Sequence, residues 1–355
     1  MKFFFYIFCI IVFIFKTETL FSKNLNYDVN NIEISGKINN DLDKKKLIEI
    51  AFQKAFIIFV NRTLLNEDAI RLHNTKILII KDLILTYQIV KSERNYKKEN
   101  FLSVNVKFDQ KKINNFLSQK RISYADISNI SLTVLPILIK EKDVFLYIDN
   151  FIYNNWTKTQ DPTEIVNDNL INYNLALENI EDLEYINKNK ENLELIDIKK
   201  ITSLHQEKNY VLLIIYFTED KFRAYVKTLI ENKEIDKNID LKIYPGNEIK
   251  SYKEAILKLK EEISQIWKEQ NLIDVNTPLF SDFFLDIKQT NDYVKLRSVL
   301  NSMDIIENYS VLEMTNKHVK IRIKYKGKVS KIRDKFIEQK IGIKIIDNIW
   351  RSRIN

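Results

Sequence analysis

The chain has 355 residues, of which 45% are hydrophobic and 29% are charged, and its formal net charge is +8. This composition is typical of a folded chain of about two domains and argues against wholesale disorder. Only four glycines, three histidines and one cysteine occur. Phosphate-binding loops need clustered glycines, and cysteine cages need several cysteines. The sequence therefore predicts no cofactor and no bound metal.

The first 22 residues are predicted to be a secretory signal peptide. Lys2 precedes thirteen uncharged residues, 3–15, and Ser22 offers a small residue before a cleavage site. A spanning helix needs about 20 apolar residues, so a cleaved leader is favoured over an uncleaved inner-membrane anchor. Cleavage would remove Cys9, the sole cysteine. We therefore expect a periplasmic protein that is stabilised by packing rather than by disulfides.

Residues 23–125 are expected to form a small α+β layer, because one alternating strand is followed by apolar residues at spacings of three and four. The expected elements are a strand at 32–34, a helix after Asp41 that includes 48–59, a helix between 67 and 83, strands at 85–93 and 101–108, and a short helix around 113–117.

Residues 126–273 are expected to form a mixed sheet with one long helix. The apolar run at 130–139 is a buried strand, with Pro136 at its end or at a bulge. The stretch 161–200 has ten carboxylates against four lysines and is expected to hold short helices and loops. Strands at 210–217 and 222–230 form a hairpin, and the turn at Pro245 and Gly246 leads into the long helix.

Residues 279–350 follow a linker at 274–278 and show the element order βαββαβ, which is that of a ferredoxin-like fold. The expected elements are strands at 282–288, 305–314, 318–325 and 342–348 and helices at 291–302 and 329–339. The whole chain is thus predicted to be a multi-unit α+β and α/β protein.

Three parts of the sequence resemble a known family. They are the helix at 48–59, the run 106–109 with 116–117 and 132–138, and the helix at 293–300 leading to 323–327. On these residues the mature chain resembles an uncharacterised family of exported proteobacterial proteins, described as a domain of unknown function. The family has no assigned activity, so the resemblance implies no catalytic residues.

Two of the units are also similar to parts of envelope proteins. The middle unit is similar to the N-terminal α/β domains of proteins such as the Tol translocation component. The last unit is similar to small βαββαβ modules of secretion and pilus machinery, which pair with other proteins. Both likenesses imply a role in envelope assembly, by analogy of fold alone.

The excess positive charge lies in the last 39 residues, which carry a net +10 and leave −2 for the rest of the chain. Here Lys320, Arg322, Lys324 and Lys326 alternate with apolar residues, so they should share the sheet face that the helices leave open. We predict that these four residues bind an anionic partner: an acidic protein, a cell-wall polymer or lipid headgroups. The acidic stretch at 161–200 is another possible partner, within the chain or in a second copy. The alternative is that this face has no partner and is simply solvated, and that it is rich in lysine because of codon bias.

No catalytic residue is predicted, since the histidines are widely spaced and no serine lies in a nucleophile turn. The leading interpretation is a non-enzymatic envelope protein that acts in assembly or maintenance through protein contacts. Two alternatives are a cell-wall hydrolase using paired carboxylates, such as Asp282 and Asp286, and a membrane-surface attachment module using the basic face. Nucleic acid is not expected as a partner, because export separates the protein from cytoplasmic nucleic acid. Proteins that bind single strands also place aromatic residues on the open sheet face, whereas the alternation places Tyr325 on the core side.

Overall fold

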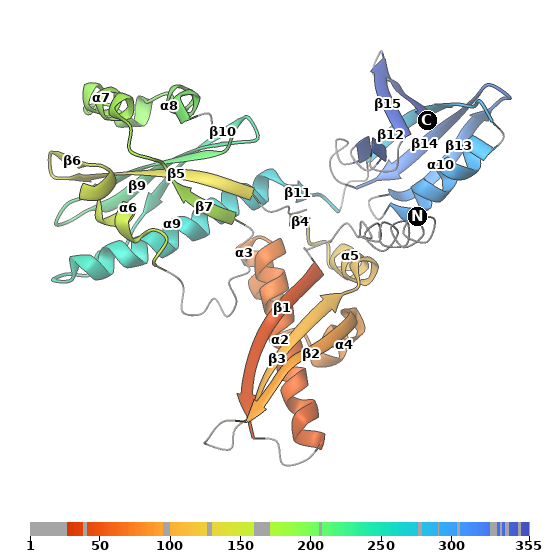
Figure 1. Cartoon of the computed structure of the whole chain (residues 1–355), viewed down its shortest axis with the longest axis horizontal. Helices are drawn as coiled ribbons and strands as arrows, with labels where there is room; N and C mark the ends of the chain where they lie inside the picture. Colours follow the sequence, from red (N-terminus) through yellow and green to blue (C-terminus); the bar gives the residue numbers. More distant parts are fainter. Residues whose placement is uncertain are drawn as a thin grey trace, which may run out of the picture.

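The structure is a computed structural model of the whole chain. It describes residues 27–37, 41–94, 100–125, 130–159, 171–205, 208–275, 279–289, 291–303, 306–326, 332–333, 336–337, 341–346 and 349–354. The predicted signal peptide and linker residues 276–278 lie outside this part. Three units, each with its own sheet and core, follow one another along the chain (Figure 1). No helix in the described part is long and apolar enough to cross a membrane.

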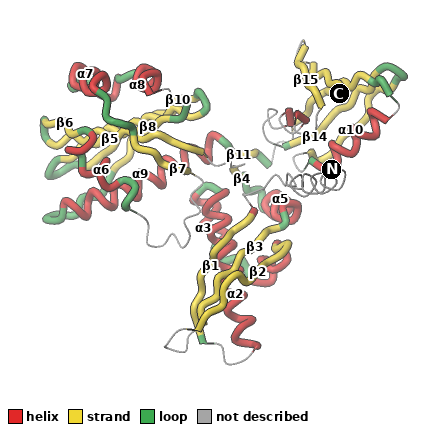
Figure 2. Tube along the Cα trace, viewed as in Figure 1, coloured by secondary structure: helices red, strands yellow, loops and turns green. Residues whose placement is uncertain are grey.

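The N-terminal unit is a three-stranded antiparallel sheet packed on helices, which agrees with the predicted α+β layer (Figure 2). Its strand order is β1-β3-β2. The elements are β1 (Asp28–Gly36), α2 (Asp41–Thr63), α3 (Asn66–Leu72), α4 (Ile77–Leu83), β2 (Ile84–Arg94), β3 (Asn100–Phe108) and α5 (Gln110–Gln119). Two helices replace the single one predicted at 67–83. The break follows from Lys76, which is extended, and from the Thr75 hydroxyl, which donates to the Leu72 carbonyl at 2.6 Å.

The middle unit is a six-stranded mixed sheet in the order β10-β9-β8-β5-β6, with β7 also paired to β5. Its strands are β5 (Ile130–Lys140), β6 (Asp143–Phe145), β7 (Ile171–Leu175), β8 (Tyr210–Phe217), β9 (Phe222–Ile230) and β10 (Lys233–Asp240). Its helices are η2 (Tyr147–Asp149), α6 (Phe151–Asn155), α7 (Ile180–Lys188), η3 (Leu193–Leu195), α8 (Ile198–His205) and α9 (Glu248–Gln270). Strand β10 was not predicted, because it is a polar edge strand that buries only Ile239.

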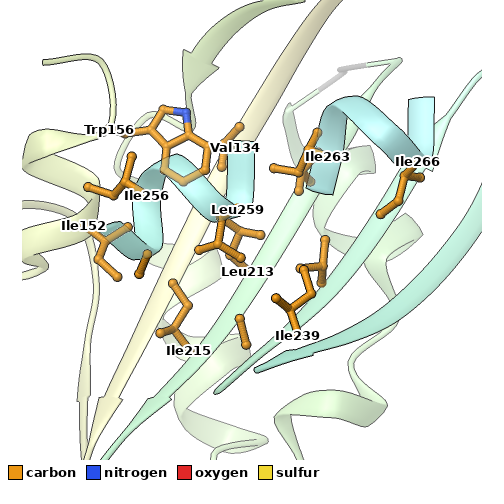
Figure 3. Close-up of a cluster of buried hydrophobic side chains, with 14 of the residues drawn as sticks. Val134, Ile152, Trp156, Leu213, Ile215, Ile239, Ile256, Leu259, Ile263 and Ile266 are labelled. Carbon is orange, nitrogen blue, oxygen red and sulfur yellow. The ribbon is translucent and has the colours of Figure 1, made fainter. Parts of the chain in front are cut away.

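Helices cover both faces of this sheet. The predicted long helix α9 packs Ile256, Leu259 and Ile263 on one face, together with Trp156 of the adjoining segment (Figure 3). The α7, η3 and α8 segment packs on the other face. Strand β8 is apolar throughout because it lies in the middle of the sheet and is buried on both sides.

Pro136 lies inside strand β5 rather than at its end. Strand β7 pairs with β5 only as far as Val134, and β6 begins to pair at Leu138. The proline therefore faces the gap between these two short strands, where no partner needs an N–H. Its carbonyl accepts from the side-chain amide of the buried Asn150 at 2.9 Å.

The C-terminal unit is a five-stranded sheet in the order β13-β14-β12-β16-β15. Its elements are β12 (Leu279–Asp286), α10 (Asn291–Ser302), β13 (Ile306–Met314), β14 (His318–Tyr325), β15 (Ile341–Ile346) and β16 (Ile349–Ile354), and residues 332–333 and 336–337 are helical. The first four elements match the predicted βαββ order. The ferredoxin-like arrangement is not confirmed, because β16 was not predicted and lies between β12 and β15, parallel to β12. The unit thus continues past residue 350.

Both connections between units pass through one short antiparallel ladder, β4 (Tyr124–Ala125) with β11 (Leu272–Ile273). Beside it, the last turns of α9 contact the N-terminal unit. Asn66 bonds Gln265 there, and the buried Lys268 ammonium donates to the Asn61 carbonyl at 2.5 Å. The C-terminal unit reaches the N-terminal unit through Lys326.

Candidate binding face of the C-terminal sheet

The C-terminal sheet has one packed face and one face that we call the open face. Along β14, Val319, Ile321, Ile323 and Tyr325 are all buried, as the alternation predicted. They pack beneath α10 and the helical residues 332–333 and 336–337, and Phe336 stacks on Phe283 with ring centroids 5.1 Å apart. The side chains of opposite parity therefore stand on the open face.

Two of the predicted basic residues share one carboxylate on β12. The Arg322 guanidinium donates to both oxygens of Asp282, at 2.7 and 3.0 Å. The Lys320 ammonium lies 3.5 Å from the same carboxylate. The hydrogen bonds from Arg322, with the charges of both cations, hold the pKa of Asp282 below its ordinary value. Asp282 is thus committed to its neighbours, which argues against Asp282 as a member of a catalytic pair of carboxylates.

The other two predicted residues share a carboxylate on β13. Glu307 lies 3.0 Å from the Lys324 ammonium and 2.6 Å from the Lys326 ammonium. Partial burial raises the pKa of Glu307, but the hydrogen bonds from Lys326 and Lys324 outweigh this and bring the pKa below its ordinary value. Lys326 also donates to the Ser118 hydroxyl in α5 at 3.1 Å.

The four predicted residues are therefore brought together on one face, yet each is in an ion pair with a neighbouring strand. Two carboxylates offset half of their charge. Exposed ion pairs of this kind contribute at most about 1 kcal/mol each, so they orient the side chains more than they stabilise the sheet. These four cations are consequently less attractive to anions than the sequence alone implied.

The structure adds two aromatic residues to the open face. Strand β12 begins at Leu279, three residues earlier than predicted, and this places Phe280 on the sheet opposite Lys324. The Phe280 side chain is 60% exposed. Phe284 lies opposite Lys320, whose ammonium is 5.3 Å from the ring centroid.

The structure also places two further cations on this face. Lys344 of β15 and Arg351 of β16 are direct register partners, and Arg351 in turn is the register partner of Phe284. Both charged residues are exposed, and within the described part of the chain neither forms an ion pair or hydrogen bond through its side chain. Like charges directly opposite each other on a sheet are destabilising. The row Lys344, Arg351, Phe284, Lys320 thus crosses four strands of the open face.

The histidine side chains that the structure describes are engaged in structural contacts. His73 bonds the side-chain oxygen of Asn61 at 2.7 Å, and His318 bonds the Glu313 carboxylate at 3.1 Å. No group of three or more His, Cys, Asp or Glu side chains among the described residues is arranged to hold a metal ion. The tryptophans are core residues: Trp156, Trp267 and Trp350 are all buried.

No family model matches the sequence, and a search of curated proteins finds no match. The resemblance to exported proteins of unknown function therefore depends on the residues quoted for it.

Proposed function

We propose that this chain is an exported, non-enzymatic protein of the cell envelope that acts in assembly or maintenance by docking an acidic partner protein on the open face. The observation that supports this most directly is the opposed pair Lys344 and Arg351 beside Phe284. Repulsion between two exposed cations gives the folded chain no stability. A partner carboxylate placed between them converts this repulsion into two attractions.

The neighbouring residues fit a protein partner better than a uniform anionic surface. The paired carboxylates Asp282 and Glu307 lie among the cations and would repel a membrane surface, where each cation contributes about 1 kcal/mol at most. An acidic segment of a protein can instead place its carboxylates on the unpaired cations and its apolar side chains on Phe280. Aromatic residues and arginine are the side chains that most often anchor protein interfaces.

Export is supported by the charged start, the apolar run at 3–15 and the small residue Ser22. The test is to express the chain with its natural leader in the source cells, recover it from the periplasmic fraction and determine its N-terminal residue by mass spectrometry. A mature chain that begins near residue 23 is expected. Recovery from the cytosol with Met1 retained would refute the export part of the proposal.

Partner binding is tested by crosslinking in intact cells followed by purification of the chain. The variant Lys344→Glu/Arg351→Glu should lose its crosslinked protein partner. The matched control Lys44→Glu/Lys46→Glu makes the same charge change at exposed residues of α2 and should keep the partner. If both variants keep the same partners, or if the chain is retained by vesicles of anionic phospholipid and by no protein, the docking proposal is wrong.

A further inference from the structure

A second surface that combines exposed apolar and acidic side chains lies in the middle unit, in the segment between β7 and the first turn of α7. We call Leu177–Glu184 the acidic loop. Leu177 is 79% exposed and Ile180 is 72% exposed, which places them among the most exposed large hydrophobic residues of the described chain. Leaving such a side chain in water forgoes the free energy that burial of its apolar surface would supply. Burial against another protein would recover this energy.

The acidic loop is anchored by hydrogen bonds just before its start and at the beginning of α7. At its start, the Ala176 N–H donates to the Val134 carbonyl at 3.0 Å, and the Tyr153 hydroxyl donates to the Ala176 carbonyl at 2.8 Å. At the helix, the Asn179 side chain accepts from the Glu181 N–H at 2.9 Å. The two apolar side chains are therefore presented on a fixed frame.

A buried pair fixes the first turn of α7 beneath the acidic loop. Asp182 is fully buried and accepts from the Tyr147 hydroxyl at 3.0 Å. This contact commits one carboxylate of the acidic segment to the core. The remaining carboxylates of the loop are left at the surface.

The exposed carboxylates of the acidic loop mirror the cations of the open face. Glu178, Glu181 and Glu184 are all exposed, and within the described residues no cation lies within ion-pair distance of them. Glu181 and Glu184 are three residues apart on a helix, so they repel each other as Lys344 and Arg351 do. Each surface thus combines unpaired like charges with exposed hydrophobic side chains, and the two surfaces have opposite sign.

We propose that the acidic loop of one copy of this chain docks on the open face of a second copy. This rests on the proposed function and names its partner. Within one chain the two surfaces belong to separate units at opposite ends of the molecule, so they do not satisfy each other (Figure 1). Docking places Glu178 and Glu181 on Lys344 and Arg351, with Leu177 and Ile180 against the half-buried Phe284 ring and the exposed Phe280 ring.

The symmetry of the assembly follows from where the two surfaces lie. The contact is between different surfaces, so two copies can close as a dimer only if both loop–face pairs form between them. Otherwise each copy joins the next in an open chain. Either assembly is held largely by charge, and it should weaken as salt shortens the range of these interactions.

The test uses sedimentation velocity of the purified full chain over a range of protein concentrations. The wild type should self-associate at about 0.05 M salt and dissociate at about 0.5 M salt. The face variant, Lys344→Glu/Arg351→Glu, and the loop variant, Glu178→Lys/Glu181→Lys, should each weaken self-association at least about tenfold, since like charges then face each other in every contact.

An equimolar mixture of the two variants provides the decisive result. The acidic face of one then meets the basic loop of the other, and the unchanged loop and face also match, so association should return to the wild-type level. Recovery in the mixture also shows that both variants are folded. A mixture that remains monomeric, or a wild type that is monomeric at every concentration, overturns the inference. In that case the proposed function still stands if the face variant loses a different crosslinked protein in cells.

Discussion

Replacing Lys344 by glutamate should stabilise the C-terminal sheet while removing its binding function. Lys344 lies on the edge strand β15 and its direct register partner is Arg351, so the substitution turns a like-charge pair into an opposite-charge pair. Register partners of this kind have Cβ atoms about 4.5–5.5 Å apart, and a separation of about 7 Å between the two charged ends allows for their mutual repulsion. In water this separation gives about 0.6 kcal/mol for two unit charges. Reversing the sign therefore changes the free energy of opening the hairpin by about 1 kcal/mol at low salt.

The assay is hydrogen exchange of the backbone amides of β15 and β16, followed by mass spectrometry of peptides from this hairpin. A gain of about 1 kcal/mol corresponds to roughly fivefold slower exchange at low salt. Screening at physiological ionic strength should reduce this change in exchange rate to about twofold. The neutral variant Lys344→Gln should give about half of the effect. If Lys344→Glu exchanges faster than the wild type, or if its effect does not depend on salt, the argument from like-charge repulsion is refuted.

Three further predictions concern other parts of the molecule. Burial lowers the pKa of Lys268 to about 8, so protonation costs the folded chain about 3 kcal/mol below that pH, and this cost should disappear between about pH 8 and 10.5. Unfolding in urea at several pH values should therefore show stability rising with pH in the wild type relative to Lys268→Met; parallel curves would contradict this. Asp282→Asn frees the two β14 cations and should bind a cation exchanger more tightly than the control Asp286→Asn, while equal elution would contradict it. Asn150→Ala leaves the buried carbonyl of Pro136 without its donor and removes the side chain that caps the N-terminus of α6, so it should cost about 2–4 kcal/mol in urea unfolding, whereas a loss below about 1 kcal/mol would show that these bonds are dispensable.

Strands and helices with strong periodicity were predictable because their side chains alone determine which face is buried. The helix α9 and the strand β14 show this clearly, since every apolar position that the sequence indicated along β14 is buried. Strand β10 was missed for the opposite reason. As an edge strand it is polar, and its backbone pairing with β9 rather than its side chains makes it a strand.

The candidate site was predictable only in part. The sequence correctly placed Lys320, Arg322 and Lys324 on one face of one strand, with Lys326 just beyond its end, because alternation along a strand is a local property. It could not show that Asp282 and Glu307 neutralise them, since those residues lie on other strands and meet the cations only through the register of the sheet.

Local patterns in the amino-acid sequence were thus enough to indicate the succession of α+β and α/β units, the apolar faces of the main elements and the confinement of positive charge to the last segment. The insertion of β16 beside β12 follows from the folded sheet alone, and so does the question of which cations have no ion-pair partner among the described residues. Strand order depends on contacts between residues distant in the chain, whereas periodicity depends on near neighbours. The row formed by Lys344, Arg351 and Phe284 therefore exists only in the folded sheet.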